Sequence, residues 1–335
     1  MVHPAPGKPN GRMCADIVCA VALCCAIVTE GLAAEPLDWL GSRCRLFCAA
    51  PGTEPFAAAA PEAEALIVRT YTRVDAELLA QLPRLKVVGR AGVGIENIDV
   101  AACRARGVQV VSTPDANTQA VVEYVTCLLC DTLRPRVFLE SATTKADWDR
   151  LREEVCAPWQ MDELCLGILG FGRIGRRVAQ VAGAIGFEVS YTDLLEIPLE
   201  ARLGATPVAL ETLFAESDIL TIHVDGRPGN RGLVGASLLA RMRPDAVLLN
   251  TSRGMVLDAA ALAEFLHRNP SAMAVLDVHE PEPIDANYPL LGLRNAHLAP
   301  HLAARTNAAM EAMSWVVRDV VAVLSGQKPQ HPAWR

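Results

Sequence analysis

A glycine-rich segment near the middle of the 335-residue chain limits its possible folds more than any other feature. Residues 165–169 form a short apolar run that predicts a strand, and the apolar positions of residues 174–185 have helical spacing. The motif Gly170-x-Gly172-x-x-Gly175 joins the two, which is the setting in which three glycines bind a dinucleotide. Gly170 permits the tight turn, Gly172 lets the backbone approach a pyrophosphate, and Gly175 lets the helix pack against the strand.

The helix start and the following strand complete the predicted nucleotide site. A pyrophosphate at this position would accept hydrogen bonds from the free backbone N–H groups of Arg173 and Ile174. Asp193 ends the next predicted strand, 18 residues after Gly175. Its carboxylate can accept hydrogen bonds from both ribose hydroxyls and would repel a 2′-phosphate, and Leu194 rather than an arginine follows it. The segment therefore predicts NAD as the cofactor, with NADP as the alternative that a direct comparison of the two would test.

Short apolar strands alternate with helical patterns on both sides of this site. The alternation is typical of parallel sheets covered by helices, and the chain is long enough for two domains. Asn117 is a favourable N-cap for the longest expected helix, which closes at Arg134-Pro135. The expected strands are 23–29, 45–49, 65–69, 85–89, 108–112, 165–169, 188–191, 219–223, 246–250, 272–278 and 296–298. The expected helices are 75–81, 97–106, 117–133, 174–185, 210–217, 258–267 and 307–324, and the Ala-rich stretch 57–60 could mark a loop.

Composition and charge exclude several classes of protein. Hydrophobic residues make up 51% of the chain and charged residues 21%, so a packed globular protein is expected rather than a disordered one. The formal net charge of −7 argues against a general affinity for nucleic acid. The 11 cysteines lie mostly in apolar runs, and Cys127-x-x-Cys130 has no second pair or histidine nearby, so no metal site is expected. Free thiols in a core favour a reducing compartment such as the cytoplasm.

The N-terminal region allows two interpretations. Residues 17–28 form an unbroken apolar run of 12 residues, which follows Lys8 and Arg12 and precedes Leu32-Ala33-Ala34, as in a signal peptide. The run is too short to span a bilayer, so no membrane anchor is expected. The competing interpretation is that its second half is the first buried strand, 23–29. Cleavage after Ala34 would remove that strand, so we favour the strand and treat residues 1–20 as an extension of uncertain status.

Five motifs in a fixed order carry the interpretation beyond the nucleotide site. They are Gly89-Arg90-Ala91-Gly92-Val93-Gly94-Ile95-Glu96-Asn97-Ile98-Asp99, the glycine motif, Asn250-Thr251-Ser252-Arg253-Gly254, Asp277-Val278-His279-Glu280-Pro281-Glu282-Pro283, and Pro300-His301. From about residue 63 to its C-terminus the sequence resembles the D-isomer-specific 2-hydroxyacid dehydrogenases, the family that includes phosphoglycerate dehydrogenase.

The resemblance implies a particular architecture. It implies an α/β fold of two Rossmann-like, doubly wound parallel-sheet domains, with the active site in the cleft between them. It also implies a homodimer built largely on the nucleotide domains, and a discontinuous substrate domain. The expected boundaries are 21–113 plus 302–335 for the substrate domain and 114–301 for the NAD-binding domain, which leaves no room for a C-terminal regulatory domain.

Three residues are expected to carry the chemistry. Oxidation of an alcohol beside a carboxylate needs a base, a cation for the carboxylate, and a nicotinamide that faces the reacting carbon. His301 ends a predicted strand region, and imidazole gains and loses a proton near neutral pH. By resemblance it is the catalytic histidine, and Glu282 is the carboxylate that orients it. Arg253 follows the strand 246–250, where a guanidinium can grip a carboxylate with two hydrogen bonds.

Further residues are expected to bind substrate. The loop Gly92-Val93-Gly94 offers backbone N–H groups to an anion, and by resemblance it receives the substrate carboxylate. Arg69 ends a predicted strand, so it either contacts a second anionic group on the substrate or lies at the surface.

Three residues at other strand ends are expected to bind cofactor. His223 ends a strand at the rim of the cofactor site and lines it, and Thr251 lies in the Asn250–Gly254 motif. Asp277 is expected to contact the nicotinamide amide. His279 stands where the family usually has an aromatic residue, and we interpret it as a packing residue.

Departures from the family pattern affect the choice of substrate and leave the reaction type unchanged. Arg305 introduces a charge close to His301, Asp225-Gly226 replaces a Pro-Leu type of sequence after His223, and Tyr71 stands where a second basic residue can occur. We therefore expect an NAD-dependent dehydrogenase for a D-2-hydroxy acid or its 2-oxo acid, with phosphoglycerate itself in doubt. The alternative is a non-enzymatic NAD-sensing protein like the corepressors that use this fold, which would have no need of His301, Glu282 and Arg253 together.

Overall fold

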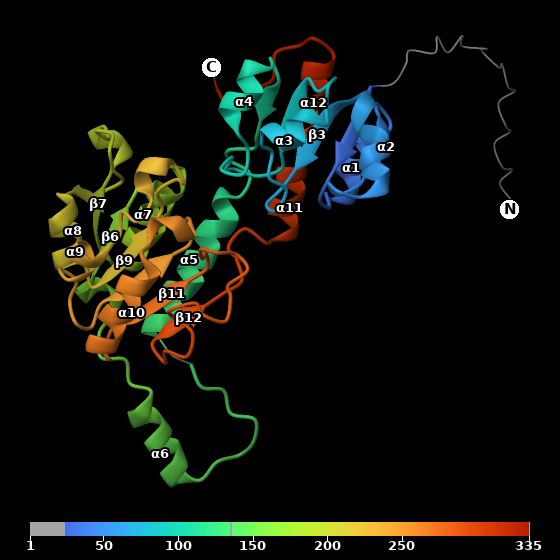
Figure 1. Cartoon of the computed structure of the whole chain (residues 1–335). Helices are drawn as coiled ribbons and strands as arrows, with labels where there is room; N and C mark the ends of the chain where they lie inside the picture. Colours follow the sequence, from blue (N-terminus) through green and yellow to red (C-terminus); the bar gives the residue numbers. More distant parts are fainter. Residues whose placement is uncertain (1–23, 135, 335) are drawn as a thin grey trace, which may run out of the picture.

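The strands of the chain lie in two parallel sheets. A computed structural model describes residues 24–134 and 136–334, and in this part of the chain every strand pairs in parallel within its sheet (Figure 1). The predicted α/β class with two parallel sheets is confirmed. We call the two halves the five-stranded lobe and the seven-stranded lobe, after their sheets. Leu23, the expected start of the first strand, lies outside the described residues, and the strand itself begins at Cys25.

The five-stranded lobe holds the first strands of the chain in the order β2-β1-β3-β4-β5. The order reverses between β1 and β3, which makes the sheet doubly wound. The strands are β1 (Cys25–Val28), β2 (Arg45–Cys48), β3 (Ala63–Val68), β4 (Val87–Arg90) and β5 (Gln109–Val111). The connecting helices are α1 (Ala34–Gly41), α2 (Glu54–Ala59), α3 (Ala76–Ala80) and α4 (Val100–Ala105).

The C-terminal helices return to this first lobe. α12 (Val317–Leu324) packs against β3 and β4, and Pro332 makes an antiparallel bridge to Val111 of β5. The expected single helix 307–324 is wrong in one respect, because α11 (Asn307–Ser314) ends before α12 begins. Ser314 is fully buried; its hydroxyl donates to the Met310 carbonyl oxygen and accepts from the backbone N–H of Ala33. A serine that bonds back to the preceding turn favours a bend at this point.

The seven-stranded lobe holds the rest of the strands in the order β12-β11-β10-β9-β6-β7-β8. Its order reverses between β6 and β9, the position at which doubly wound sheets bind ligands. The strands are β6 (Cys165–Leu169), β7 (Glu188–Thr192), β8 (Thr206–Pro207), β9 (Ile219–Ile222), β10 (Val247–Asn250), β11 (Met273–Leu276) and β12 (Ala296–Leu298). The helices are α7 (Arg173–Ile185), α8 (Leu210–Glu216), α9 (Ala236–Leu239) and α10 (Ala259–Arg268).

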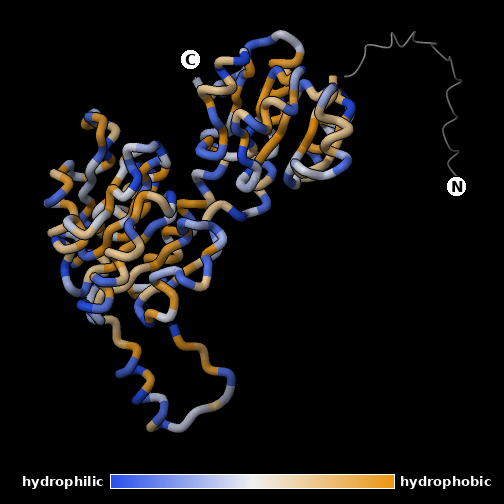
Figure 2. Tube along the Cα trace, viewed as in Figure 1, coloured by the Kyte–Doolittle hydropathy of each residue, from blue (hydrophilic) through white to orange (hydrophobic). Residues whose placement is uncertain are grey.

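Both sheets are covered on their two faces. β1, β3 and β9 are buried along their whole length, as expected where helices cover a parallel sheet on both sides. In the five-stranded lobe, Val316, Val317 and Val320 pack on one face of the sheet, and Leu79 and Leu82 pack on the other. Figure 2 shows the apolar strands inside both lobes. This burial holds the strand ends, which carry the site, in fixed positions.

The helix α5 (Thr118–Leu133) leads from one lobe to the other and packs against α7. Its buried residues Val121, Val125 and Leu129 belong to the core of the seven-stranded lobe. Asn117 stands at the N-cap position as predicted, but its side chain makes no capping hydrogen bond. The backbone N–H of Thr118 instead bonds the carbonyl oxygen of Asp115, which forms a turn before the helix.

Several elements differ from the sequence-based expectation. The helix expected at 97–106 begins at Val100, because the Asn97 amide donates to the carbonyl oxygens of Arg69 and Thr72, at 3.0 and 2.7 Å, and Asp99 caps α4. Residues 57–60 do not mark a loop, because Ala57–Ala59 continue a helix that begins at Glu54 with a proline in its first turn. The short elements α1, α9 and β8 were not predicted, because helices of eight and four residues and a strand of two residues give little periodicity.

A helical arm was also not predicted. α6 (Lys145–Glu154) and the segments beside it project from the seven-stranded lobe (Figure 1). Thr144 caps the helix, and none of the helix residues is buried. Charged residues fill most of α6, so the sequence has no apolar face that would have revealed it.

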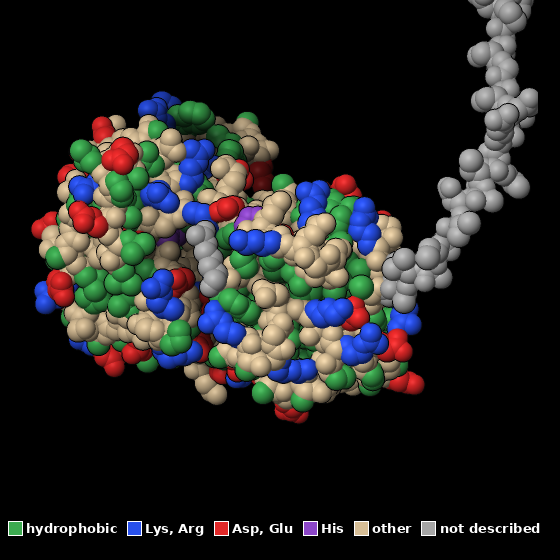
Figure 3. All heavy atoms as spheres, turned by 90° about the horizontal axis from the view of Figure 1, so that it is seen from above, with side chains coloured by type: hydrophobic (Ala, Val, Ile, Leu, Met, Phe, Trp, Pro, Cys, Tyr) green, Lys and Arg blue, Asp and Glu red, His purple; other side chains and the backbone are tan. Residues whose placement is uncertain are grey.

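Other properties of the described residues bear on function. The nine cysteines in this part of the chain are free thiols, and no group of three His, Cys, Asp or Glu side chains there could hold a metal ion. No helix among these residues is both long and apolar enough to cross a bilayer. On the face that Figure 3 shows, acidic and basic side chains are interspersed over both lobes.

Candidate active site

The expected cofactor and catalytic residues of the seven-stranded lobe follow its strands at one edge of the sheet. Parallel strands present their carboxyl ends at the same edge, so residues that follow neighbouring strands lie in a row. In sheet order, the row runs from His301 after β12 through Asp277 after β11, Arg253 after β10, His223 after β9 and the glycine loop after β6 to Asp193 after β7.

The glycine loop has a tight turn at Gly170 and a close helix approach at Gly175, and Gly172 borders open space. Gly170 has φ +95°, and a Cβ on it would lie 2.8 Å from the backbone of His223 and Val224. A Cβ on Gly175 would overlap the carbonyl oxygen of Gly170, so only glycine lets α7 lie this close to the loop. A Cβ on Gly172 would meet nothing within 4 Å. Open space therefore lies in front of Gly172, at the N-terminus of α7.

Asp193 lies against this loop. One of its carboxylate oxygens accepts a hydrogen bond from the backbone N–H of Phe171 at 2.6 Å, and the other accepts from Leu195 at 2.9 Å. A carboxylate oxygen can accept more than one hydrogen bond, so both retain capacity for a ligand hydroxyl. At the helix start the guanidinium of Arg173 pairs with Asp115 at 2.9 Å, and Ile174 continues the helix. Arg173 thereby links α7 to the segment before α5.

His223 and Thr251 line the same edge, where they directly follow the neighbouring strands β9 and β10. Burial lowers the pKa of His223 far below its ordinary value, so its ring is neutral at neutral pH. Its Nε2 lies 3.0 Å from the hydroxyl of Thr221. The hydroxyl of Thr251 is buried and has no hydrogen-bond partner among the residues that the structure describes. An unpartnered buried hydroxyl at this edge fits a bound polar group.

His301 and Glu282 form a close pair. The Nδ1 atom of His301 lies 2.8 Å from one carboxylate oxygen of Glu282. The other oxygen of Glu282 accepts a hydrogen bond from the backbone N–H of His279, also at 2.8 Å. Burial opposes ionisation of Glu282, but the hydrogen bonds from His301 and His279 outweigh it and hold the pKa of Glu282 below its ordinary value. The charged carboxylate therefore fixes the imidazole ring and leaves Nε2 as its free nitrogen.

The backbone at His301 is strained in a way typical of functional residues. His301 has φ +56°, a left-handed conformation that residues with a Cβ rarely adopt. Asp277 holds the segment that follows, because its two carboxylate oxygens accept hydrogen bonds from the backbone N–H groups of Leu302 and Ala303, at 2.6 and 2.8 Å. Burial raises the pKa of Asp277 despite these hydrogen bonds. Asp277 thus positions the His301 turn, a role that its expected nicotinamide contact did not include.

His279 is buried, and both of its ring nitrogens have partners. Nδ1 lies 3.2 Å from the hydroxyl of Tyr288, and Nε2 lies 2.8 Å from the carbonyl oxygen of Ala299. This environment agrees with the packing role expected for it. A Cβ on Gly254 would overlap the backbone of His279, so the segment that carries Arg253 lies directly against the one that carries Glu282.

Arg253 meets the five-stranded lobe. Its Nε donates to a carboxylate oxygen of Glu96 at 3.0 Å, and its Nη1 donates to the carbonyl oxygen of Ser252 at 2.7 Å. A Cβ on Gly94 would overlap its Nη2, which places the Gly92–Gly94 loop beside the guanidinium. The predicted carboxylate cation and the predicted carboxylate loop are therefore neighbours. Glu96 was missed by the sequence analysis, although it lies two residues after Gly94 in a motif that we quote.

Two more arginines lie close to this point. Arg90, at the end of β4, was not singled out from the sequence. Its Nε is buried and has no hydrogen-bond partner in the described part of the chain, and a Cβ on Gly92 would overlap its guanidinium. Burial and the nearby charge of Arg253 lower the pKa of Arg90 to about 10, so it stays charged at neutral pH. Arg69 follows β3, and its guanidinium contacts the carbonyl oxygen of Gly31 and the sulfur of Met310. Both contacts lie within the five-stranded lobe and its C-terminal helices, and they hold the guanidinium of Arg69 in place.

The residues present fit a dinucleotide at the edge of the seven-stranded sheet. The first turn of α7 offers free backbone N–H groups, the space at Gly172 is open, and the Thr251 hydroxyl lacks a partner. Asp193 stands at the end of the next strand with acceptor capacity. These observations concern different strands and agree on one ligand position.

Comparison with known sequences identifies one enzyme family. Residues 126–303 match the family model described as D-isomer specific 2-hydroxyacid dehydrogenase, NAD binding domain. The glyoxylate reductase of Aeropyrum pernix is 36% identical over 285 residues, which cover 83% of this chain and 85% of that enzyme. The D-3-phosphoglycerate dehydrogenase of Mycobacterium tuberculosis is 34% identical over 304 residues, which cover 90% of this chain but only 57% of that longer enzyme.

Solved structures agree with the sequence matches. An NADPH-dependent glyoxylate/hydroxypyruvate reductase from Sinorhizobium meliloti, solved with NADP and malonate, superposes with a TM-score of 0.78 at 27% identity. The superposition covers 93% of this chain and 97% of that one. The likeness therefore extends over both lobes.

Proposed function

This chain belongs to the D-isomer specific 2-hydroxyacid dehydrogenase family, and from this premise we propose that His301 moves the proton while a hydride passes between NAD and C2 of a D-2-hydroxy acid. As a member, the chain is an NAD-dependent oxidoreductase that acts on CH–OH groups. The observation that supports the residue assignment best is the His301–Glu282 pair at 2.8 Å, held at a strand end in the row that carries Arg253 and the glycine loop.

His301 acts as the acid and the base in this proposal. With Nδ1–H directed at Glu282, Nε2 carries the lone pair that accepts the hydroxyl proton when the hydroxy acid is oxidised. The resulting imidazolium is stabilised by the ionised carboxylate of Glu282, whose pKa is below its ordinary value. In the reverse direction the same Nε2–H donates to the oxygen of the 2-oxo acid. A bound nicotinamide would supply the hydride acceptor for oxidation at C2 and, in its reduced form, the hydride donor for the reverse reaction.

Arg253 and the Gly92–Gly94 loop bind the substrate carboxylate. The guanidinium has donors left after its contacts with Glu96 and Ser252. In the loop beside it, the Gly92 N–H donates to the Arg90 carbonyl oxygen, and the N–H groups of Val93 and Gly94 have no partner among the described residues. Binding by both lobes would place the carboxylate where they meet and would turn C2 towards His301. Arg69 lies farther along the same side, beside Arg90, and would contact a second anionic group if the acid has one.

The cofactor would lie along the edge of the seven-stranded sheet. The pyrophosphate would bind the N-terminus of α7 at Gly172, Arg173 and Ile174, and Thr251 would supply its unpartnered hydroxyl. Asp193 would accept from the ribose hydroxyls, which favours NAD over NADP. Because a similar enzyme uses NADPH, the preference of this chain is a property of its own residues and requires its own measurement.

We also propose that the chain forms a homodimer through the arm around α6. The arm exposes Val137, Phe138, Leu139, Trp148 and Trp159, and Phe138 is 82% exposed. A ten-residue helix without a buried face is marginal in water unless another surface covers it. We expect Phe138→Asp with Trp148→Glu to convert a dimer into a monomer in light scattering coupled to size exclusion, whereas Leu291→Asp on the body leaves the dimer intact. A monomeric wild-type chain would overturn this proposal.

The remaining expectations from sequence stay proposals. We place the domain boundaries at 21–113 plus 302–335 and at 114–301, supported by the packing of α12 on β3 and β4. The free thiols support a reducing compartment such as the cytoplasm.

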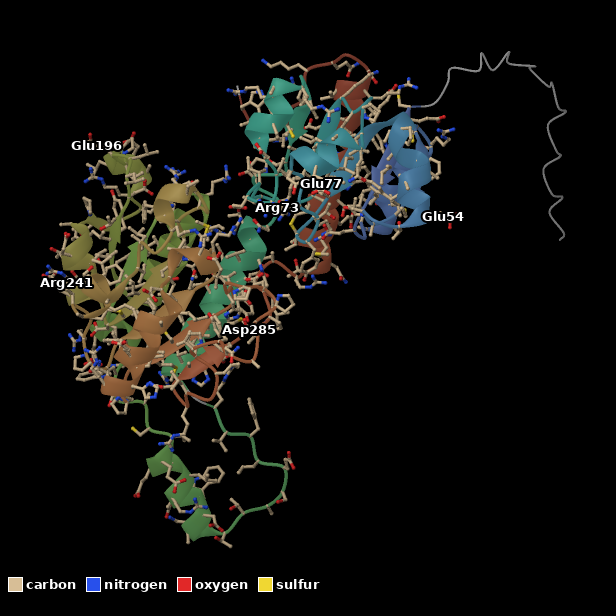
Figure 4. The ribbon with its side chains drawn as sticks, viewed as in Figure 1. Glu54, Arg73, Glu77, Glu196, Arg241 and Asp285 are labelled. Atoms are coloured by element: carbon tan, nitrogen blue, oxygen red, sulfur yellow. The ribbon has the colours of Figure 1, made fainter. Side chains whose placement is uncertain are left out.

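Turnover with a set of acids tests the proposed function. Glyoxylate and hydroxypyruvate with NADH, and D-3-phosphoglycerate with NAD, are followed at the nicotinamide absorbance. We expect turnover with at least one acid, a loss of about a hundredfold or more in kcat for His301→Ala, and unchanged NADH binding in that variant. Arg253→Ala should raise KM, and Arg241→Ala is its control, since Arg241 lies on the far side of the seven-stranded lobe (Figure 4). No turnover with any acid despite tight NADH binding would refute the function.

A further inference from the structure

Glu96 joins the two lobes at the expected substrate position. It lies between β4 and α4 of the five-stranded lobe, and its carboxylate pairs with Arg253, which follows β10 of the seven-stranded lobe. A Cβ on Gly226, after β9, would come within 2.6 Å of the same carboxylate. Glu96 therefore contacts two neighbouring strand ends of the opposite lobe. The pair is about one-third exposed, with side-chain exposures of 30% for Arg253 and 35% for Glu96.

The three nitrogens of Arg253 have different surroundings. Nε is held by Glu96 and Nη1 by the carbonyl oxygen of Ser252. Nη2 makes no hydrogen bond within the described residues and lies against Gly94. An unheld guanidinium on a flexible stem samples many orientations, and each ordered contact removes part of that freedom. The two contacts leave one edge of the guanidinium directed at the loop that offers backbone N–H groups.

The negative charge of Glu96 gives it a second effect on the guanidinium of Arg253. Arg90 and Arg253 are close enough for their positive charges to act on each other, and the carboxylates that oppose this repulsion at Arg90 are Glu96 and, more weakly, Glu30. Like charges at such separations in a partly desolvated site repel by more than they do in water. Without Glu96, Arg253 would lose a hydrogen bond and would also be pushed away from Arg90 and the Gly92–Gly94 loop.

We propose that Glu96 is a positioning residue for Arg253, which holds the guanidinium so that its Nη2 and the Gly92–Gly94 loop receive the substrate carboxylate together. The proposal rests on the carboxylate-binding role of Arg253 given above. Because Glu96 and Arg253 come from different lobes, the carboxylate site is complete only when the lobes are in contact. Anion affinity is thereby coupled to the relative position of the two sheets.

Binding of oxamate, an unreactive analogue of a 2-oxo acid, tests this proposal independently of turnover. Its Kd is measured by calorimetry on the full chain saturated with NADH. We expect Glu96→Ala to raise the oxamate Kd by about tenfold or more. Glu96→Gln keeps an oxygen acceptor at the same reach and should recover much of that loss. The Kd for NADH should stay within about twofold of wild type in both variants, because no cofactor residue is altered.

A matched control and a second variant separate positioning from general damage. Glu264→Ala breaks a glutamate–arginine pair of the same kind with Arg268 on the exposed side of α10, and it should change neither Kd. Gly226→Ala would press its methyl group on the Glu96 carboxylate, so it should raise the oxamate Kd in the wild-type background. The same substitution should have little further effect in Glu96→Ala, because the group that it displaces is absent.

Each outcome decides the proposal. An unchanged oxamate Kd in Glu96→Ala, or a wild-type chain that binds NADH but no oxamate, overturns it. Tighter oxamate binding in Glu96→Ala also overturns it, because Glu96 would then be a competitor of the substrate carboxylate. If the wild type shows no turnover but the oxamate Kd values of the wild type and the variants change as expected, the proposed reaction is refuted and the role of Glu96 stands.

Discussion

Gly172 and Gly175, the second and third glycines of the nucleotide loop, should respond differently to substitution by alanine. An alanine at Gly175 would put a methyl group into the carbonyl oxygen of Gly170 and within 3.2 Å of a methyl group of Ile168. Neither the carbonyl nor the buried strand that carries Ile168 can rotate away as an exposed side chain can. An alanine at Gly172 would meet nothing within 4 Å. The Gly175→Ala variant therefore tests whether α7 needs glycine to pack against the loop, and the Gly172→Ala variant tests whether the cofactor needs glycine to approach the backbone.

The cost of Gly175→Ala follows from how far the helix must move. The added Cβ would lie 2.2 Å from the Gly170 carbonyl oxygen. Non-bonded heavy atoms in ordinary contact are about 3.5 Å apart, so α7 would have to shift by more than about 1 Å from the loop. That shift would disturb Val178, Ala179 and Ala182, which are buried in the core. Overpacking of this kind costs about 2 to 3 kcal/mol. For a domain of this size, the cost corresponds to a decrease of about 4 to 12 °C in Tm.

Thermal unfolding and an NADH titration measure the two effects separately. We expect Gly175→Ala to lower the Tm of the cofactor-free chain, as followed by circular dichroism. Gly172→Ala should leave that Tm within about 2 °C of wild type, because it adds no clash, and should weaken NADH binding about tenfold or more. A wild-type Tm for Gly175→Ala, or an equal loss of Tm in both variants, would refute the reasoning about helix approach.

Three further predictions concern individual side chains. Glu282→Gln should lower kcat by on the order of a hundredfold and leave the Kd for NADH unchanged, because the amide cannot stabilise the imidazolium of His301; a wild-type kcat would exclude this role. Asp193→Ser should raise kcat/KM with NADPH relative to NADH by about tenfold, and no change in that ratio would count against a ribose contact. Burial lowers the pKa of His223, so below pH ~6.5 the unfolded chain binds more protons than the folded one and stability falls as the pH decreases. His223→Asn should therefore show a smaller decrease in Tm between pH ~7 and ~5, and an unchanged pH dependence would contradict the assignment.

Local patterns in the sequence were sufficient to predict the framework of the site. The alternation of strand and helix patterns indicates parallel sheets, and the family resemblance implies two of them. A residue that directly follows a strand must lie at the carboxyl edge of its sheet. His301, Arg253 and Asp193 were therefore placed correctly at strand ends without any knowledge of their contacts. The glycine roles could be predicted for the same reason, because a turn and a helix start depend on adjacent residues.

What the sequence missed involves contacts between segments that are far apart in the chain. Glu96 and Arg253 are separated by 157 positions and come from different lobes, so no spacing rule relates them. Asp277 supports the turn after His301, a role that depends on the register between β11 and β12. The α6 arm escaped prediction because it lacks the apolar periodicity that packing against its own chain would produce.

The glycine loop therefore depends on residues that are adjacent in the sequence, whereas the Glu96–Arg253 pair depends on a contact that only the tertiary structure creates. The sequence by itself determined which residues stand at the strand ends and that a dinucleotide fits the loop, because the backbone conformation of a few consecutive residues decides both. Only the tertiary structure decided which carboxylate orients Arg253 and which arginines lie around it. Those contacts form when two separate sheets approach each other, and the free energy of that approach is spread over the whole packed core rather than stored in any local pattern.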